Sequence, residues 1–119
     1  ETEDRKTGLK DGSATAGHNF FVRGAMLKVV GDHESVGVTL TDSKGATTKL
    51  TDDQITINNP SSLTLLLPAD LAEGEYTLTV TTQYSNSYTL KVPRSISTPI
   101  WIGGKPADGG GGSESPDEV

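Results

Sequence analysis

Every second residue is apolar in several short stretches of the chain, and this period of two limits the folds that it can adopt. In the clearest stretch, Tyr76, Leu78 and Val80 alternate with threonines. A β-strand points successive side chains to opposite faces, so one face of such a stretch is buried and the other is exposed. No comparable helical period occurs, and residues 70–74 offer at most one short turn. We therefore expect a sandwich of short antiparallel strands. The remaining alternating stretches are Val36, Val38 and Leu40; Ile55 and Ile57; Leu63, Leu65 and Leu67; and Tyr88, Leu90 and Val92.

Glycine, asparagine and proline mark the expected ends of these strands. Residues 42–45 (DSKG) are typical of a hairpin turn in which Gly45 supplies a positive φ. Residues 58–61 (NNPS) predict a second sharp connection, because proline restricts the residue before it. Pro68 closes the stretch 63–67, and Pro93 closes the predicted strand 88–92.

The pattern changes phase near Gly24. Phe20 and Val22 are apolar at even positions, whereas Leu27 and Val29 are apolar at odd ones. One extra residue in a strand produces such a change, and glycine accepts the backbone angles that a β-bulge often needs. We favour a bulge or bend at Gly24 over the alternative, in which two strands are joined by a turn at Gly24 and Ala25.

Length and composition indicate one domain with two loose ends. The chain has 119 residues, which suits a single domain, here expected over residues 5–102. Residues 1–4 are expected to fray, and residues 103–119, which are rich in glycine, serine and acids, to form a flexible tail. No methionine opens the chain, so we expect that a signal peptide or another domain precedes it in a longer protein.

The net charge of −6 comes from the two ends. Residues 5–102 hold nine acids and nine bases, and are neutral. The domain therefore has no excess of lysine and arginine. Direct binding of nucleic acid depends on such residues at the phosphates. No run is long and apolar enough for a membrane-spanning helix, and no secretory pattern opens the chain. The lack of cysteine excludes disulfides and thiolate metal sites.

Catalytic motifs are missing from the sequence. None of the nucleophile-elbow, zinc-protease, P-loop or dinucleotide-binding patterns occurs. The two histidines, His18 and His33, are expected in exposed loops, and a catalytic role would need both to converge with carboxylates. The acids at 52–53 and 70–75 lack the spacing of a calcium loop. We therefore predict neither an enzyme nor a cofactor or metal site.

Several motifs together resemble one family of uncharacterised bacterial proteins. They are GDHESVGV at 31–38, NNPSSL at 58–63, GEYTLTVTTQYS at 74–85 and KVPRS at 91–95. In that family an immunoglobulin-like domain of the IPT/TIG kind follows an HU-like (IHF/HU-type) DNA-binding domain. The glycine and aromatic at the start of 74–85 are also reminiscent of a tyrosine corner. Ala16 stands where the family has proline, and His33-Glu34 stands where it usually has Asp-Pro.

The resemblance implies an immunoglobulin-like antiparallel β-sandwich of about seven strands. It implies a cytoplasmic, nucleoid-associated setting in which DNA is a partner only through the HU-like domain, which this chain lacks. On this interpretation the chain is an accessory or interaction module whose protein partner is unknown. The alternatives are an extracellular or periplasmic module of a surface or polysaccharide-handling protein and, third, an enzyme that uses His18 or His33. The predicted interaction residues, mostly in two loops, are Phe21, Asp32, His33, Glu34, Asn58 and Asn59.

Overall fold

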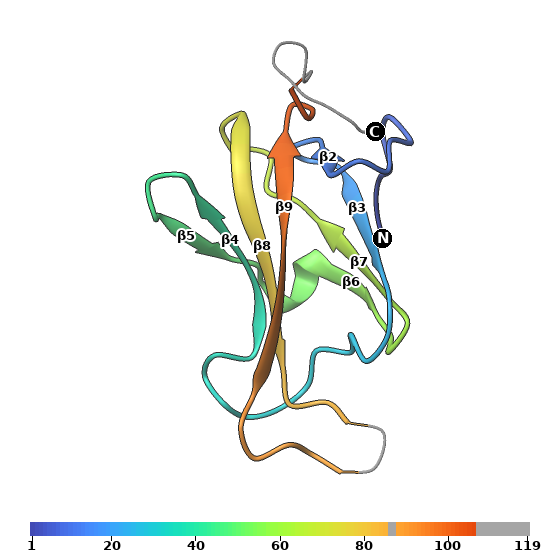
Figure 1. Cartoon of the computed structure of the whole chain (residues 1–119), viewed down its shortest axis with the longest axis vertical. Coiled ribbons are helices and arrows are strands. Elements are labelled where there is room, and N and C mark those ends of the chain that lie inside the picture. The colour runs from blue at the N-terminus through green and yellow to red at the C-terminus, as the bar shows by residue number, and fades with distance from the viewer. Residues whose placement is uncertain (86–87, 107–119) are drawn as a thin grey trace.

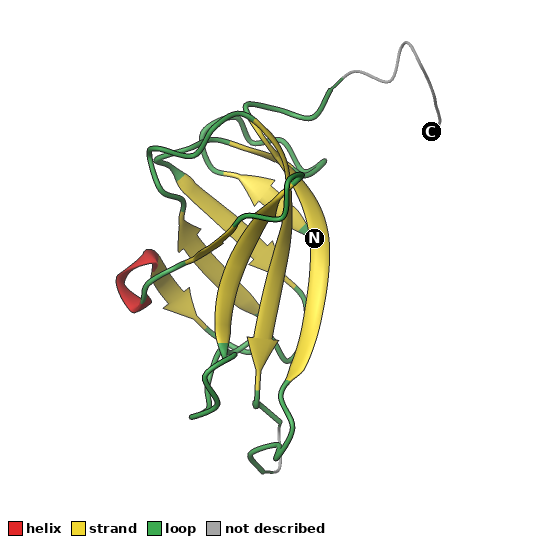
Figure 2. Ribbon diagram, turned by 90° about the vertical axis from the view of Figure 1, so that its left-hand side faces the viewer, coloured by secondary structure: helices red, strands yellow, loops and turns green. Residues whose placement is uncertain are grey.

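The computed structural model describes residues 1–85 and 88–106, which form two β-sheets packed face to face (Figures 1 and 2). The four-stranded sheet has the order β1 (Thr2–Asp4), β3 (Asn19–Arg23), β7 (Ser62–Leu66) and β6 (Ile55–Asn58). The five-stranded sheet has the order β2 (Ser13–Ala14), β9 (Arg94–Ile102), β8 (Gly74–Thr82), β4 (Gly37–Asp42) and β5 (Thr47–Lys49). A 3-10 turn, η1 (Asp52–Gln54), precedes β6.

The strand order is that of an immunoglobulin domain. Strands β1, β3, β7 and β6 correspond to A, B, E and D, and β4, β8 and β9 to C, F and G. The predicted all-β, immunoglobulin-like class is therefore confirmed, with nine strands among the described residues rather than about seven. No helix among these residues is long and apolar enough to cross a membrane.

The core lies between the sheets and follows the period of two. The apolar faces of β3, β7, β4 and β8 point inward, as the alternation predicts. Because a strand buries alternate residues, the threonines of β8 lie mainly on its outer face, while its apolar residues fill the interior. The buried apolar residues are Ala14, Phe20, Val22, Leu27, Val38, Leu40, Leu50, Leu63, Leu65, Leu67, Tyr76, Leu78, Val80, Ile100 and Ile102.

The predicted tyrosine corner is present. Tyr76 is buried, and its Oη donates a hydrogen bond to the carbonyl of Ala72 at 2.9 Å. The bond returns to the backbone a few residues upstream, as in immunoglobulin domains. The hairpin turn at 42–45 also forms, with the N–H of Gly45 donating to the carbonyl of Asp42 and a φ of 88° at Gly45.

The bulge lies elsewhere than predicted. Strand β3 ends at Arg23 and the chain bends over residues 24–26, so of the bulge or bend predicted at Gly24 the structure has the bend and no β-bulge. The register instead shifts in β6 between Ile55, which pairs with Leu65, and Ile57, which pairs with Thr64. The extra residue turns Ile57 to the outer face, where it is 47% exposed.

Residues 88–92 do not form the predicted strand. They belong to the loop between β8 and β9, where Tyr88 is 67% and Val92 is 76% exposed. The register pairs Thr82 with Arg94, so β9 begins only after Pro93 and brings Ile100 and Ile102 into the core. The apolar alternation at 88–92 lacks a neighbouring strand that could bury it.

Residues 1–4 and 103–106 are better ordered than the sequence suggests. Residues 1–4, which were expected to fray, include strand β1, which pairs with β3 from Thr2↔Val22 to Asp4↔Phe20. Residues 103–106, expected in the tail, fold back: the N–H of Gly103 donates to Ala14 and that of Lys105 to Ser13 Oγ. The remainder of the predicted tail, 107–119, lies outside the described residues.

Candidate functional site

A groove opens between the two sheets along one side of the sandwich, with a volume of about 460 Å³. One wall is formed by β1 and β3, and the other by β9. The groove exists because the first part of the chain divides between the sheets: β1 pairs with β3, whereas β2 pairs with β9 only at Ser13↔Trp101 and Ala14↔Ile102. The short β2 leaves most of the outer edge of β9 uncovered.

The floor of the groove is apolar and comes from both sheets. Val22 and Leu27 belong to the β1–β3 side, and Leu78 and Val80 to β8. Ile96 of β9 pairs with Val80 across the sheet, yet it is 53% exposed whereas Val80 is 3% exposed. The core therefore reaches the surface at Ile96.

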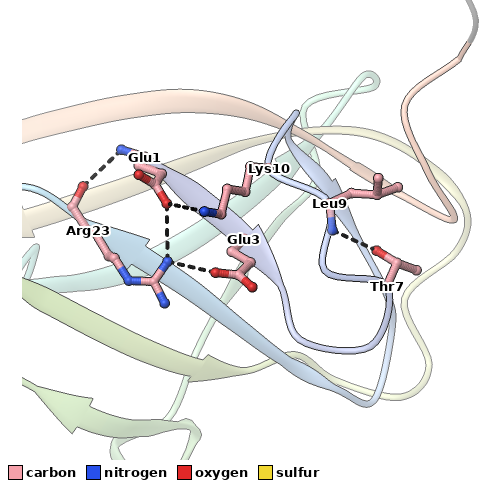
Figure 3. A network of polar contacts seen from close by, with 6 residues as sticks. All are labelled: Glu1, Glu3, Thr7, Leu9, Lys10 and Arg23. Carbon is pink, nitrogen blue, oxygen red and sulfur yellow. Dashed lines mark hydrogen bonds and ion pairs between the residues drawn. The ribbon is translucent and has the colours of Figure 1, made fainter.

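Charged side chains line the rim of the groove (Figure 3). Arg23 Nη1 lies 2.9 Å from Glu3 Oε1 and 3.3 Å from Glu1 Oε2, and Lys10 Nζ lies 3.6 Å from the same Glu1 oxygen. These side chains are 25–60% exposed, and ion pairs so open to solvent contribute little to stability. The rim supplies both signs of charge around an apolar floor.

The upper end of the groove is closed by a tight contact between Gly12 and Trp101. Gly12 has φ +95°, and a Cβ there would lie 2.7 Å from Cζ3 of Trp101. Lys105 Nζ sits 5.1 Å from the centroid of the Trp101 ring. Beside them, burial alone would raise the pKa of Asp11, but hydrogen bonds from Ser13 and the charge of Lys105 outweigh it, and the pKa is lowered.

The predicted interaction residue Phe21 lies away from the loops, on the outer face of β3. It is half-buried, and the guanidinium of Arg23 sits 5.1 Å from its ring centroid. Asp32, His33 and Glu34 are exposed in the loop before β4. This loop is tied to the five-stranded sheet, since the N–H of His33 donates to Gln83 Oε1 and Lys49 Nζ donates to the carbonyl of Glu34.

Asn58 holds the backbone in place. Its Oδ1 accepts from the N–H of Val29 at 2.7 Å, and its Nδ2 donates to the Val29 carbonyl at 2.9 Å. Asn59 forms the neighbouring turn through backbone hydrogen bonds with Ser62. The structure thus joins the asparagine loop to the segment before Asp32, and the hydrogen bonds of Asn58 and His33 go to different partners.

Four buried polar residues were missed by the sequence reasoning: Asp4, Ser13, Thr82 and Gln83. Thr82 is 1% exposed; its Oγ1 accepts from the N–H of Val30 and donates to the carbonyl of Lys28 at 2.6 Å. Asp4 is also 1% exposed and lies at the end of β1. The even position of Thr82, in phase with Val80, is the signal that predicts its inward orientation.

The histidines do not form a reactive cluster with each other. The Nδ1 of His33 lies 2.8 Å from Ser35 Oγ and also accepts from the N–H of Ser35, which is a local turn in an exposed loop. His18 makes backbone hydrogen bonds to Thr15 and Leu67. Within residues 1–85 and 88–106, no three histidine or acidic side chains gather as metal ligands would. What the groove offers is shape, apolar surface and strand edges, which suit binding.

The fold defines an immunoglobulin-like domain with a groove between its two sheets. The chain belongs to the family described as a domain of unknown function (DUF4469) with an immunoglobulin-like fold, whose model matches residues 1–96. It is also similar to the crystal structure of a "putative bacterial DNA binding protein" from Bacteroides vulgatus, with 51% identity over 88% of this chain and a TM-score of 0.84. The chain spans 46% of that protein's length. None of the curated proteins matches.

Proposed function

We propose that the chain is a non-enzymatic accessory module of a longer DNA-binding protein, and that an HU-like domain outside this chain makes the DNA contacts. The observation that carries the proposal is the 51% identity to the Bacteroides vulgatus protein, whose name states DNA binding and of which this chain spans less than half. Under this proposal the protein is cytoplasmic and associated with the nucleoid.

The charges of the chain support a division of labour between the two parts. Residues 5–102 carry no net charge, and two bases of the groove, Lys10 and Arg23, already face acids. Proteins that bind DNA directly gain most of their affinity from lysine and arginine at the phosphates. A neutral surface with paired bases favours contact with protein.

An accessory role is also favoured over catalysis by the positions of the titratable groups. His18 and His33 lie in separate loops, and the groove is lined by none of the histidines. General acid–base chemistry requires such groups to converge within hydrogen-bond reach of a substrate. The groove instead presents an apolar floor with ion pairs along its rim.

The proposal is tested by comparing the 119-residue chain with the full-length Bacteroides vulgatus protein in a DNA mobility-shift assay at about 150 mM salt. The longer protein is expected to shift a duplex, and the chain alone to leave it unshifted at about a hundredfold higher concentration. A shift by the chain alone that is as strong as that of the longer protein would overturn the division of labour. Failure of the longer protein to bind would overturn the DNA-related setting.

A further inference from the structure

The outer edge of β9 offers backbone groups to another strand. The N–H of Trp101 donates to the carbonyl of Gly12 and that of Gly103 to Ala14, both at 2.9 Å, so odd-numbered residues point their backbone groups away from β8. The β8–β9 ladder runs without a register shift from Thr82↔Arg94 to Gly74↔Ile102. Because backbone direction alternates along an antiparallel ladder, the backbone groups of Ser95 and Ser97 also face outward.

Two prolines bound this edge. Pro99 is an odd-numbered residue, so its backbone faces outward, but proline has no N–H to donate. Pro93, also odd-numbered, directly precedes the strand. The edge between them therefore presents two N–H donors and two carbonyls, those of Ser95 and Ser97. Within the described part of the chain, no backbone hydrogen bond reaches this edge, because β2 covers only Trp101 and Ile102 (Figure 1).

On both faces of the sheet, cross-strand rows of side chains stop at this edge of β9, because no further strand of the described residues pairs there. On the inner face, Val38, Val80 and Ile96 form one cross-strand row in which only Ile96 is exposed. On the outer face, hydroxyl pairs link Thr81 to Ser95 at 2.8 Å and Thr79 to Ser97 at 2.9 Å. Another strand at this edge would extend both rows.

We propose that the occupant of this edge is a second copy of the chain, bound by antiparallel pairing of β9 with β9 around a two-fold axis at Ile96. In this register Ser95 lies opposite Ser97 of the second copy, and the reverse. Each pair exchanges two hydrogen bonds, so all four free donors find acceptors. Ile96 faces its own copy at a non-hydrogen-bonded position, where side chains approach closely.

The uncovered edge of β9 is complementary to itself. Binding of an unrelated protein would not require this property. A two-fold axis brings the same patch onto itself, and here the donors, the acceptors and the apolar residue all match under that operation. The prolines fall opposite one another, Pro93 against Pro99, so neither leaves a donor or blocks one that the pairing needs. The proposed ladder would use the same edge of β9 on which β2 already pairs, in parallel, at Trp101 and Ile102. The proposal is independent of any role in DNA binding.

The test is sedimentation equilibrium of the 119-residue chain from about 10 μM to about 1 mM, since so short an interface predicts a weak dimer. The average mass should rise with concentration from 12.5 kDa toward twice that value. Ser97→Pro removes one outward-facing N–H from β9. Pro99, which faces outward in the same strand, shows that proline is tolerated at such a position. The Ser97→Pro variant should remain monomeric, whereas its matched control Ser97→Ala, which keeps the N–H, should dimerise like the wild type.

Ile96→Lys provides a second variant that leaves the backbone unchanged. It places like charges opposite each other at the axis and should also abolish the dimer, while circular dichroism confirms the fold of each variant. Amide exchange at Ser95 and Ser97 should slow about tenfold or more on concentrating the wild type. A wild type that stays monomeric, or a Ser97→Pro variant that dimerises as well as Ser97→Ala, overturns the proposal.

Discussion

The buried carboxylate of Asp4 accepts a hydrogen bond from the hydroxyl of Thr15, eleven residues along the chain, at 2.8 Å. The same oxygen accepts from Thr7 Oγ1 at 2.8 Å, and the other carboxylate oxygen faces the N–H of Lys6. Asp4 thereby connects β1, the turn that follows it and the segment leading to β3. The N-terminal strand that forms one wall of the groove depends on this residue.

Replacement of Asp4 by asparagine should lower the free energy of unfolding by about 1–3 kcal/mol. The amide removes the charge that strengthens these hydrogen bonds, and with its nitrogen toward Thr7 and Thr15 it requires both hydroxyls to turn from donor to acceptor. Urea denaturation measures the loss. Asp32→Asn, in an exposed loop, is the matched control and should change stability by less than about 0.5 kcal/mol. Equal effects of the two changes would show that the Asp4 contacts are dispensable.

The sequence alone could not reveal this role of Asp4. In the amino-acid sequence Asp4 is one of three acids among the first four residues, a pattern typical of a solvated chain end. Its burial depends on Thr7 and Thr15, whose hydroxyls approach it only after the chain has turned. By contrast, the periodicity of 76–82 places Tyr76, Leu78 and Val80 correctly, because a local pattern determines which face of a strand is apolar.

Tyr76→Phe removes the hydroxyl that donates to the carbonyl of Ala72 and should destabilise the domain by about 0.5–1.5 kcal/mol. For a domain of this size, the melting temperature should fall by several degrees, on the order of 4 °C. Tyr88→Phe is the control, because Tyr88 is 67% exposed and lies in the β8–β9 loop. A melting temperature that falls equally in both variants would argue against a stabilising role for the corner.

The groove was not predictable for a different reason. It arises because β2 has only two residues and begins opposite Trp101, which leaves Ile96 uncovered. Strand length in such a polar stretch is set by tertiary pairing and carries no periodic signal. The bulge in β6 was missed likewise, since Ile55 and Ile57 have the spacing of one face and only their pairing with Leu65 and Thr64 separates them.

Asn58 was predicted as an interaction residue, and its two hydrogen bonds to Val29 lead to a different expectation. Asn58→Ala should lower the free energy of unfolding by about 1–3 kcal/mol, because both backbone groups of Val29 lose their partner in a partly buried site. Asn59→Ala, at the next and exposed position, should stay within about 0.5 kcal/mol of the wild type. Chemical denaturation distinguishes them. A stable Asn58→Ala variant would return this residue to the list of binding candidates.

The lowered pKa of Asp11 predicts a pH-dependent contribution to stability. Burial opposes ionisation, but the hydrogen bonds from Ser13 and the charge of Lys105 favour the carboxylate, so the folded-state pKa lies below its usual 3.8. A group with a depressed folded pKa stabilises the protein above its unfolded pKa and loses that contribution as the pH falls through the folded value. Unfolding of the wild type and of Asp11→Asn should therefore be compared from about pH 7 down to about pH 2.5.

The difference in free energy of unfolding between these two proteins should be constant down to about pH 5 and should decline toward acid, because only the wild type has a carboxylate to protonate at this position. Taking the difference cancels the contribution of the groups that the two proteins share. In a Lys105→Gln background the decline should shift to higher pH, since the nearby positive charge no longer favours the carboxylate. A difference that stays flat across the range would mean that Asp11 titrates alike in the folded and unfolded chain, and that the hydrogen bond from the Ser13 N–H at 2.9 Å does not favour its ionised form.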